Sequence, residues 1–152
     1  MKKPPPRSPK ADPLDVIDLD AMLSDEETDV RAMVRRVATD LCGEHIAQWY
    51  EDGQVPAREL AREFGKAGLL GMHLDGYGCA GMSAVDYGLA SVELEAVDSG
   101  IRSLVSVQGS LAMGAIHMFG SEEHKQQWLP SMAAGEAIGC FGLTEPDHGS
   151  DP

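Results

Sequence analysis

The stretch GCFGLTEPDHGSDP, residues 139–152, combines residue types that could form one side of a ligand site. A short apolar run brings the hydroxyl of Thr144 to a turn that contains Pro146, and Gly149 and Ser150 follow. Glycine lets a ligand approach the backbone closely, and such a turn offers N–H and hydroxyl donors to an anion or a polar ring edge. The same residue types also form ordinary surface turns, so the composition alone leaves both interpretations open.

Arg102 is the second residue whose setting indicates chemistry. It is the one Lys or Arg in the apolar stretch IRSLVSVQGSLAMGAIHMFG, residues 101–120. A guanidinium is costly to bury unless it is paired, and its planar N–H groups fit a carboxylate in a bidentate arrangement. Arg102 could therefore bind a carboxylate ligand, or it could pair with an internal acid such as Asp98.

Metal and dinucleotide motifs are weaker candidates. The five histidines, at positions 45, 73, 117, 124 and 148, lack the spacing of a metal site, so no metal is expected, and His117 is expected to be a satisfied core residue. The string GYGCAG, residues 76–81, matches G-x-G-x-x-G, but no βαβ unit surrounds it. We expect it to connect two helices rather than to bind a dinucleotide.

Capped helices are expected to position these residues. Ser24 with Glu27 and Ser83 with Asp86 form capping boxes, and Ser121 precedes a third helix. Apolar residues recur at helical spacing from the first cap to about Tyr50, which predicts one long helix or two with a weak joint at Gly43.

Further helices and one strand complete the prediction. Residues 57–71 predict a short helix, and residues 83–100 predict one that ends at Gly100. Residues 101–120 are apolar on most sides, as expected in the middle of a bundle. Residues 137–145 contain aromatic and branched residues between Gly and Pro, which favours a β-strand.

Length and charge exclude several classes of protein. The chain has 152 residues, enough for one ordinary domain, and no apolar run long enough to span a bilayer. Its net charge of -13 disfavours nucleic acid and anionic membranes as partners. Three cysteines without close spacing argue against a disulfide framework, and the N-terminus lacks a signal or transit pattern, so a cytoplasmic location is expected. Residues 1–17, rich in Pro and Lys near their start, are expected to be a disordered arm.

The string CFGLTEPDHGSDP, residues 140–152, closely resembles the flavin-contacting signature of the acyl-CoA dehydrogenases. GIRSLVSVQGSLAM, residues 100–113, and MFGSEEHKQQWLPSMAAGEAIG, residues 118–139, resemble the N-terminal helical domain of that family. The pattern is nearest to its glutaryl-CoA branch. The resemblance implies a mainly α fold, with an N-terminal all-α domain over residues 18–135 and the first strand and turn of a truncated β domain over residues 136–152.

The resemblance also implies roles for particular residues. Arg102 would bind the distal carboxylate of the acyl chain, with Ser103 and Ser150 also at the substrate. FAD is the implied cofactor, and it would be contacted by Phe141, Gly142, Leu143, Thr144, Gly149 and Ser150. No role is implied for Asp147 or His148.

The implied reaction is the α,β-dehydrogenation of an acyl-CoA, which in the glutaryl branch converts glutaryl-CoA to crotonyl-CoA with loss of CO₂. The family's base is a Glu in a C-terminal domain that this sequence does not include, so no catalytic residue is assigned and the chain alone is expected to be inactive. The complete enzyme would be a homotetramer that passes electrons to an electron-transferring flavoprotein. Two alternatives stay open: a non-catalytic helical interaction module, and a dehydrogenase or oxidase for a monocarboxylic acyl-CoA.

Overall fold

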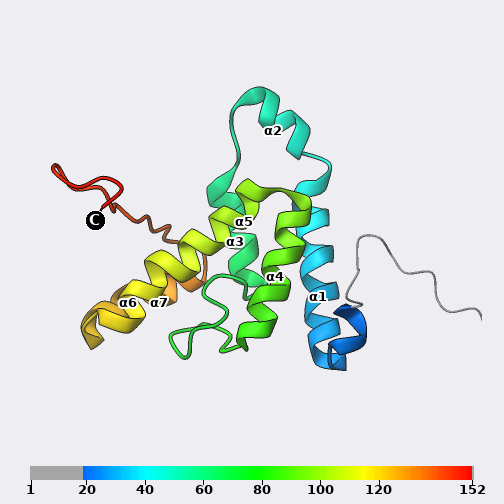
Figure 1. The fold of residues 1–152 in the computed structure, drawn as a ribbon, viewed down its shortest axis with the longest axis horizontal. Coiled ribbons are helices and arrows are strands. Elements are labelled where there is room, and N and C mark those ends of the chain that lie inside the picture. The colour runs from blue at the N-terminus through cyan, green and yellow to red at the C-terminus, as the bar shows by residue number, and fades with distance from the viewer. Residues whose placement is uncertain (1–18, 152) are drawn as a thin grey trace, which may run out of the picture.

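A computed structural model describes residues 19–151, and these residues form a bundle of helices without a β-strand (Figure 1). The mainly α fold expected from the sequence is therefore confirmed, while the predicted arm at residues 1–17 lies outside the described residues. The elements are η1 (Leu19–Met22), α1 (Asp25–Ala38), η2 (Thr39–Gly43), α2 (Ile46–Asp52), α3 (Ala57–Lys66), α4 (Ala84–Val97), α5 (Ser99–Ser106), η3 (Val107–Met113), α6 (Gly114–Phe119) and α7 (Glu122–Ala133).

The helix starts lie where the serines predicted them. The Ser24 side chain accepts from the N–H of Glu27, and the Glu27 carboxylate accepts from the N–H of Ser24. Ser83 and Asp86 make the same reciprocal pair at the start of α4. Ser121 accepts from the N–H of His124 at the start of α7. Each cap satisfies backbone donors that the first helical turn leaves unpaired.

The weak joint after the first helix is also confirmed. α1 runs into the π-helical turn η2, and α2 follows as a separate helix that ends at Gly53 in the left-handed conformation. α2 projects from one end of the bundle, beyond helices α1, α3 and α4 (Figure 1).

The predicted end of α4 at Gly100 is wrong, because the helix stops at Val97. Asp98 is extended (φ -167°), and its carboxylate accepts from the N–H groups of Gly100 (2.8 Å) and Ile101 (3.1 Å). It therefore acts as the N-cap of α5, and the chain reverses direction at this residue, so that α5 packs back on α4.

The core lies between α1, α3, α4 and the α5–η3 stretch. Its largest fully buried side chains include Phe64, Leu69, Met72, Leu94 and Met113. The apolar stretch at residues 101–120 is buried only in part. Ile101, Val105 and Met113 are core residues, whereas the end of α6 emerges into solvent, with Met118 65% and Phe119 83% exposed.

A buried carboxylate joins α1 to α4. Glu93 is 3% exposed and accepts from Nε of Arg31 (2.6 Å) and Nε of Arg35 (2.7 Å). Burial by itself raises the pKa of Glu93, but hydrogen bonds and charge from Arg35 and Arg31 outweigh it and hold this pKa below its ordinary value. Glu93 and these two arginines thus hold α1 and α4 against each other through one buried carboxylate.

The predicted strand at residues 137–145 is absent from the described residues. The segment is extended but has no ladder, and its one bridge joins Glu145 to His148 across a tight turn. Phe141 and Leu143 are half exposed. An extended segment becomes a strand only when a neighbour pairs with its N–H and C=O groups, and residues 19–151 supply no such neighbour.

Candidate functional site

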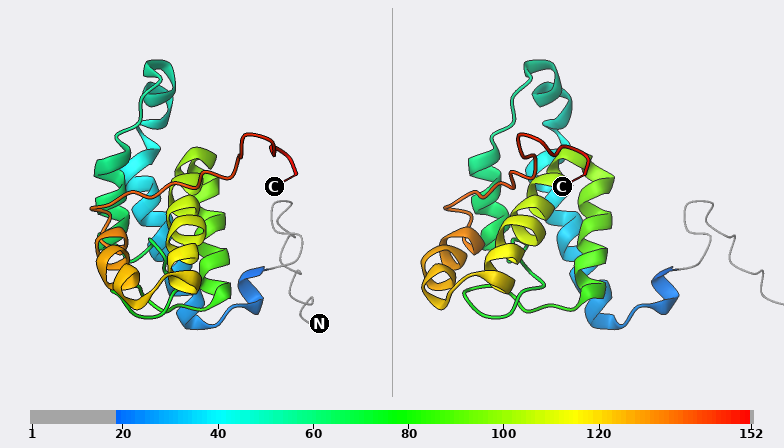
Figure 2. Two further views of the ribbon diagram at one scale, coloured as in Figure 1. Left: turned by 90° about the vertical axis from the view of Figure 1, so that its left-hand side faces the viewer. Right: turned by 60° about the vertical axis from the view of Figure 1, so that its left-hand side comes forward.

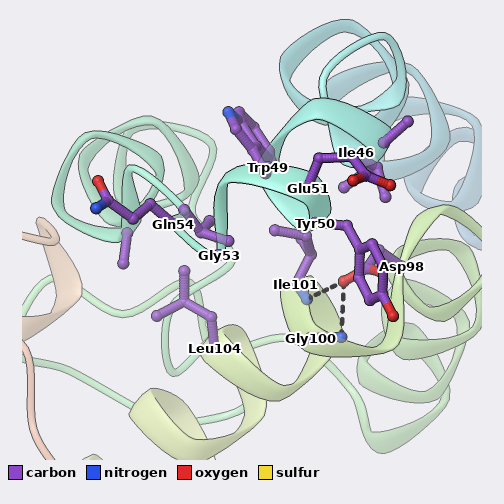
Figure 3. A pocket seen from close by; sticks show the side chains of 13 residues that line it. Ile46, Trp49, Tyr50, Glu51, Gly53, Gln54, Asp98, Gly100, Ile101 and Leu104 are labelled. Atoms are coloured by element: carbon purple, nitrogen blue, oxygen red, sulfur yellow. Dashed lines mark hydrogen bonds between the residues drawn. The ribbon is translucent and has the colours of Figure 1, made fainter.

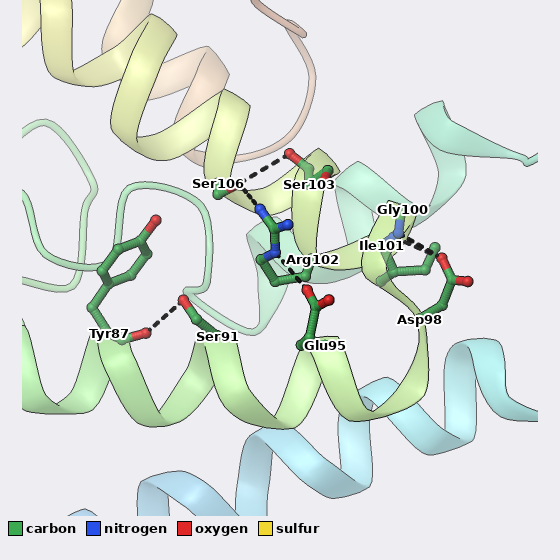
Figure 4. Close-up of polar contacts among 9 residues, drawn as sticks. All are labelled: Tyr87, Ser91, Glu95, Asp98, Gly100, Ile101, Arg102, Ser103 and Ser106. Atoms are coloured by element: carbon green, nitrogen blue, oxygen red, sulfur yellow. Dashed lines mark hydrogen bonds and ion pairs between the residues drawn. The ribbon is translucent and has the colours of Figure 1, made fainter.

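Arg102 lies in the first turn of α5, facing the last turns of α4 (Figure 4). Its Nε donates to Oε2 of Glu95 over 2.7 Å, and its Nη1 donates to the hydroxyl of Ser106 over 3.1 Å. The side chain is 36% exposed. Two of the five guanidinium hydrogens are used in this way, and Nη2 makes no hydrogen bond to the described residues.

The acid beside Arg102 is Glu95 and not Asp98, the candidate that the sequence suggested. Asp98 instead caps α5 with its carboxylate. Glu95 lies on α4 and reaches Arg102 only because the chain reverses at Asp98.

A hollow of about 460 Å³ opens beside this pair, between α4 and α5. Its lining consists of Ser91, Val92, Glu95, Ala96 and Arg102. It presents the guanidinium of Arg102 and the carboxylate of Glu95 beside small and apolar neighbours, and the guanidinium suits the carboxylate end of a short apolar chain.

Hydroxyl groups continue from Arg102 along the following turns. Ser103 is half-buried beside it, and its carbonyl accepts from the hydroxyl of Ser106 (3.3 Å). Further along, the hydroxyls of Ser110 and Tyr87 are 2.5 Å apart and join η3 to α4. Ser103, Ser106 and Ser110 thus give this helical stretch a polar face that can form hydrogen bonds with a ligand.

The residues expected at a flavin lie on the segment after α7, which leaves the bundle and is drawn in red in Figure 2. Phe141, Gly142, Leu143, Thr144, Gly149 and Ser150 are all exposed. The predicted turn within this segment is present, because the N–H of Glu145 donates to the carbonyl of His148 (2.9 Å). Space is open where a side chain would stand at Gly142 and Gly149.

Gln108 ties the start of this segment to η3, and the sequence analysis did not single out this residue. Its Nε2 donates to the carbonyls of Met132 (3.0 Å) and Ala137 (2.8 Å), while its Oε1 accepts from the N–H of Gly139 (2.8 Å). The residue is 1% exposed. At Gly139 a Cβ atom would stand 2.5 Å from Cβ of Ala112, so the close approach requires glycine. A lone Gln in an apolar stretch was the signal that could have suggested a buried polar anchor.

The GYGCAG loop connects α3 to α4, as expected, and packs on the last helices. Tyr77 has a positive φ of 53°, and its hydroxyl donates to the carboxylate of Glu122 (2.9 Å). His117 is half-buried, and its Nε2 lies 3.0 Å from the carbonyl oxygen of Asp75.

Two other kinds of feature are absent from residues 19–151. Within residues 19–151, no cluster of three or more His, Cys, Asp or Glu side chains is arranged to hold a metal ion. In the same range, no helix has the length and apolar character required to cross a membrane.

Comparison with known proteins gives consistent matches. The family described as "Acyl-CoA dehydrogenase, N-terminal domain" matches residues 24–136. The crystal structure of glutaryl-CoA dehydrogenase from Mycobacterium smegmatis is 71% identical, with a TM-score of 0.86 over 90% of this chain and 35% of that one. A structure described as a glutaryl-CoA dehydrogenase from the same organism in complex with FADH2 is 57% identical, with a TM-score of 0.86 over 91% of this chain and 36% of that one.

An acyl-CoA dehydrogenase of Bacillus subtilis is 34% identical over 82% of this chain and 34% of its own length. The chain thus spans about a third of the length of these relatives.

Proposed function

Because this chain belongs to the acyl-CoA dehydrogenase family, we propose that it is the N-terminal portion of an FAD-dependent enzyme that oxidises and decarboxylates glutaryl-CoA to crotonyl-CoA. The observation that supports this substrate is the geometry of Arg102. Its guanidinium is held by Glu95 and Ser106, and Nη2 has no hydrogen-bond partner among the described residues. The 71% identity to the glutaryl-CoA dehydrogenase of M. smegmatis supports the same substrate.

Charge and geometry favour a dicarboxylic acyl group at this position. A carboxylate at the far end of the acyl chain would accept charge-assisted hydrogen bonds from Nη2 and from the second hydrogen of Nη1. Ser103, beside Arg102 in the same turn, would supply a further hydroxyl. An acyl chain without a distal charge would leave these donors unpaired, which lowers its binding relative to the diacid.

The segment with Phe141, Gly142, Leu143, Thr144, Gly149 and Ser150 fits an approach to FAD. The open space at Gly142 and Gly149 lets a planar ring come near the backbone, and the exposed hydroxyls of Thr144 and Ser150 are donors for its polar edge. When bound, FAD supplies the acceptor for the hydride that leaves the acyl chain. Ser150 would also lie beside the acyl-CoA.

The contribution of this chain to the reaction is orientation. With its distal carboxylate on Arg102, the acyl chain has one end fixed, and its reacting carbons are held at a set distance from that anchor. We assign no catalytic residue within these 152 residues, because the base of the reaction belongs to a part of the enzyme that the chain does not span. We therefore expect this chain by itself to be inactive.

Other features of the proposal concern the complete enzyme. Residues 18–135 would form its N-terminal helical domain, and residues 136–152 would begin its middle domain. Electrons would pass from the reduced flavin to an electron-transferring flavoprotein, and the assembled enzyme would be a homotetramer.

A chimera tests the proposal. In it, this chain replaces the matching third of the M. smegmatis glutaryl-CoA dehydrogenase, and reduction of an artificial electron acceptor is followed with glutaryl-CoA and with butyryl-CoA. We expect turnover of glutaryl-CoA, release of CO₂ and a higher kcat/KM for glutaryl-CoA than for butyryl-CoA. A chimera that retains flavin but prefers butyryl-CoA would refute the glutaryl assignment and favour a monocarboxylic substrate.

A further inference from the structure

The segment proposed to contact FAD is held at its start by Gln108. The amide of this residue donates to the carbonyl of Ala137 (2.8 Å) and accepts from the N–H of Gly139 (2.8 Å). The hydrogen bonds of residues 140–151 to other described residues all lie within that segment. Within the described part of the chain, Gln108 is therefore the last hydrogen-bonded contact between the helices and the segment.

Gln108 is itself fixed in position. Its side chain is 1% exposed, and a second donation, to the carbonyl of Met132, leaves neither Nε2 nor Oε1 without a partner. A flipped amide would turn its NH₂ group toward the N–H of Gly139, so one orientation is favoured. The residue lies on the π-helical turn η3, and such turns are uncommon and frequently occur at functional sites.

An apolar cavity of about 740 Å³ between α2 and the start of α5 is an alternative place for a planar ring (Figure 3). Its lining includes Trp49, Ile101 and Leu104, but neither Gln108 nor any residue from 137 to 151. A ring in this cavity would bind independently of Gln108. A ring on the exposed segment would depend on it.

We propose, on the basis of the function given above, that Gln108 is a positioning residue for FAD. It acts through Gly139 and touches neither the flavin nor the acyl group. By holding Gly139 before the cofactor arrives, it restricts the directions in which residues 141–150 leave the helices. A segment that is already oriented loses less conformational entropy when it binds, so Gln108 raises the affinity for FAD.

The affinity of the chimera with the M. smegmatis enzyme for FAD tests this proposal. The cofactor is removed, and binding of added FAD is followed by the quenching of flavin fluorescence. Gln108→Leu should raise the Kd for FAD about tenfold. Gly139→Ala keeps the amide but places a Cβ atom 2.5 Å from Cβ of Ala112, which displaces the backbone from Gln108 and should raise this Kd as well.

Leu104→Ala separates positioning from a general loss of stability. Leu104 lines the cavity and packs against the core, so its truncation should lower the Tm of the chimera, as Gln108→Leu does. It should leave the Kd for FAD unchanged, because it does not contact the segment. The Tm of each chimera without FAD shows that the two variants are matched.

Three outcomes would overturn the proposal: an unchanged Kd with Gln108→Leu, an equal rise in all three variants, or a rise with Leu104→Ala alone. The last would place the ring in the cavity. None of these measurements uses glutaryl-CoA. A chimera that prefers butyryl-CoA but loses FAD affinity with Gln108→Leu would refute the substrate and support the positioning role, whereas a chimera that binds no FAD would refute both.

Discussion

Arg102 and Glu95 form an ion pair across the reversal between α4 and α5, with Nε of the guanidinium 2.7 Å from Oε2 of the carboxylate. The guanidinium therefore has a counter-charge before any ligand arrives. A carboxylate ligand would be attracted by Arg102 and repelled by Glu95 at the same time, so affinity at this position depends on both residues.

Glu95→Gln is expected to strengthen the binding of a dicarboxylic acyl-CoA. Glutamine can still accept from Nε of Arg102, so the guanidinium keeps its orientation while the repulsion is removed. Because Glu95 is half exposed, solvent screens the effect, and we expect KM for glutaryl-CoA in the chimera to fall by roughly threefold. A rise in KM would show that the negative charge of Glu95 helps binding.

Arg102→Met keeps most of the side-chain volume and removes all five donors. Loss of charged hydrogen bonds should lower kcat/KM for glutaryl-CoA by about 10- to 100-fold. The value for butyryl-CoA, which has no distal carboxylate, should change little. Arg62→Met, at an exposed position of α3, is the control, and equal losses with both substrates would contradict a role in carboxylate recognition.

Gln108→Leu should both destabilise the chain and release its C-terminal segment. The change leaves the carbonyls of Met132 and Ala137 and the N–H of Gly139 without their present partner. We expect a loss of about 2–4 kcal/mol in the free energy of unfolding, measured with urea, and faster proteolysis after residue 139. Gln126→Leu, at an exposed position of α7, should change neither quantity.

Acid should weaken the contact between α1 and α4. The pKa of Glu93 is lower in the folded chain than its ordinary value of 4.5, so its stabilisation is complete above pH 4.5 and is lost as pH falls through the folded value. Glu93→Gln should cost roughly 3 kcal/mol at pH 7 and should flatten the decline in stability below pH 4.5. Urea unfolding at several pH values measures both effects, and an unchanged acid decline would contradict this assignment.

The purified 152-residue chain should not oxidise acyl-CoA. We expect no reduction of an artificial acceptor with glutaryl-CoA, even when FAD is added, because the chain spans about a third of the enzymes it resembles. Measurable turnover by a homogeneous preparation would place the base of the reaction within this chain.

Local sequence signals predicted the helix starts well, because a capping box places its two partners within four consecutive residues. Features that depend on residues far apart in the sequence could not be predicted from local patterns. α4 stops at Val97 because the Asp98 carboxylate caps the next helix, and Glu95 contacts Arg102 across that reversal. The predicted strand at residues 137–145 lacks a ladder because pairing depends on a neighbour that no local pattern specifies. The role of Arg102 is a prediction that Arg102→Met tests, and the roles of Ser103 and of the segment from Phe141 to Ser150 stay predictions.

Gln108 links the two segments proposed to bind ligands, which are the helical stretch with Arg102 and the exposed segment after Gly139. It lies on the same continuous helical stretch as Arg102, which begins at Ser99, and its amide holds Gly139, from which the exposed segment starts. Gln108 would then be the shared point that sets the distance between the substrate carboxylate on Arg102 and the flavin on the exposed segment. A residue inserted between Arg102 and Gln108 would turn the guanidinium by about 100° and leave Gly139 in place. Such an insertion would take the guanidinium away from Glu95 and Ser106 while the hydrogen bond between Gln108 and Gly139 stays in place.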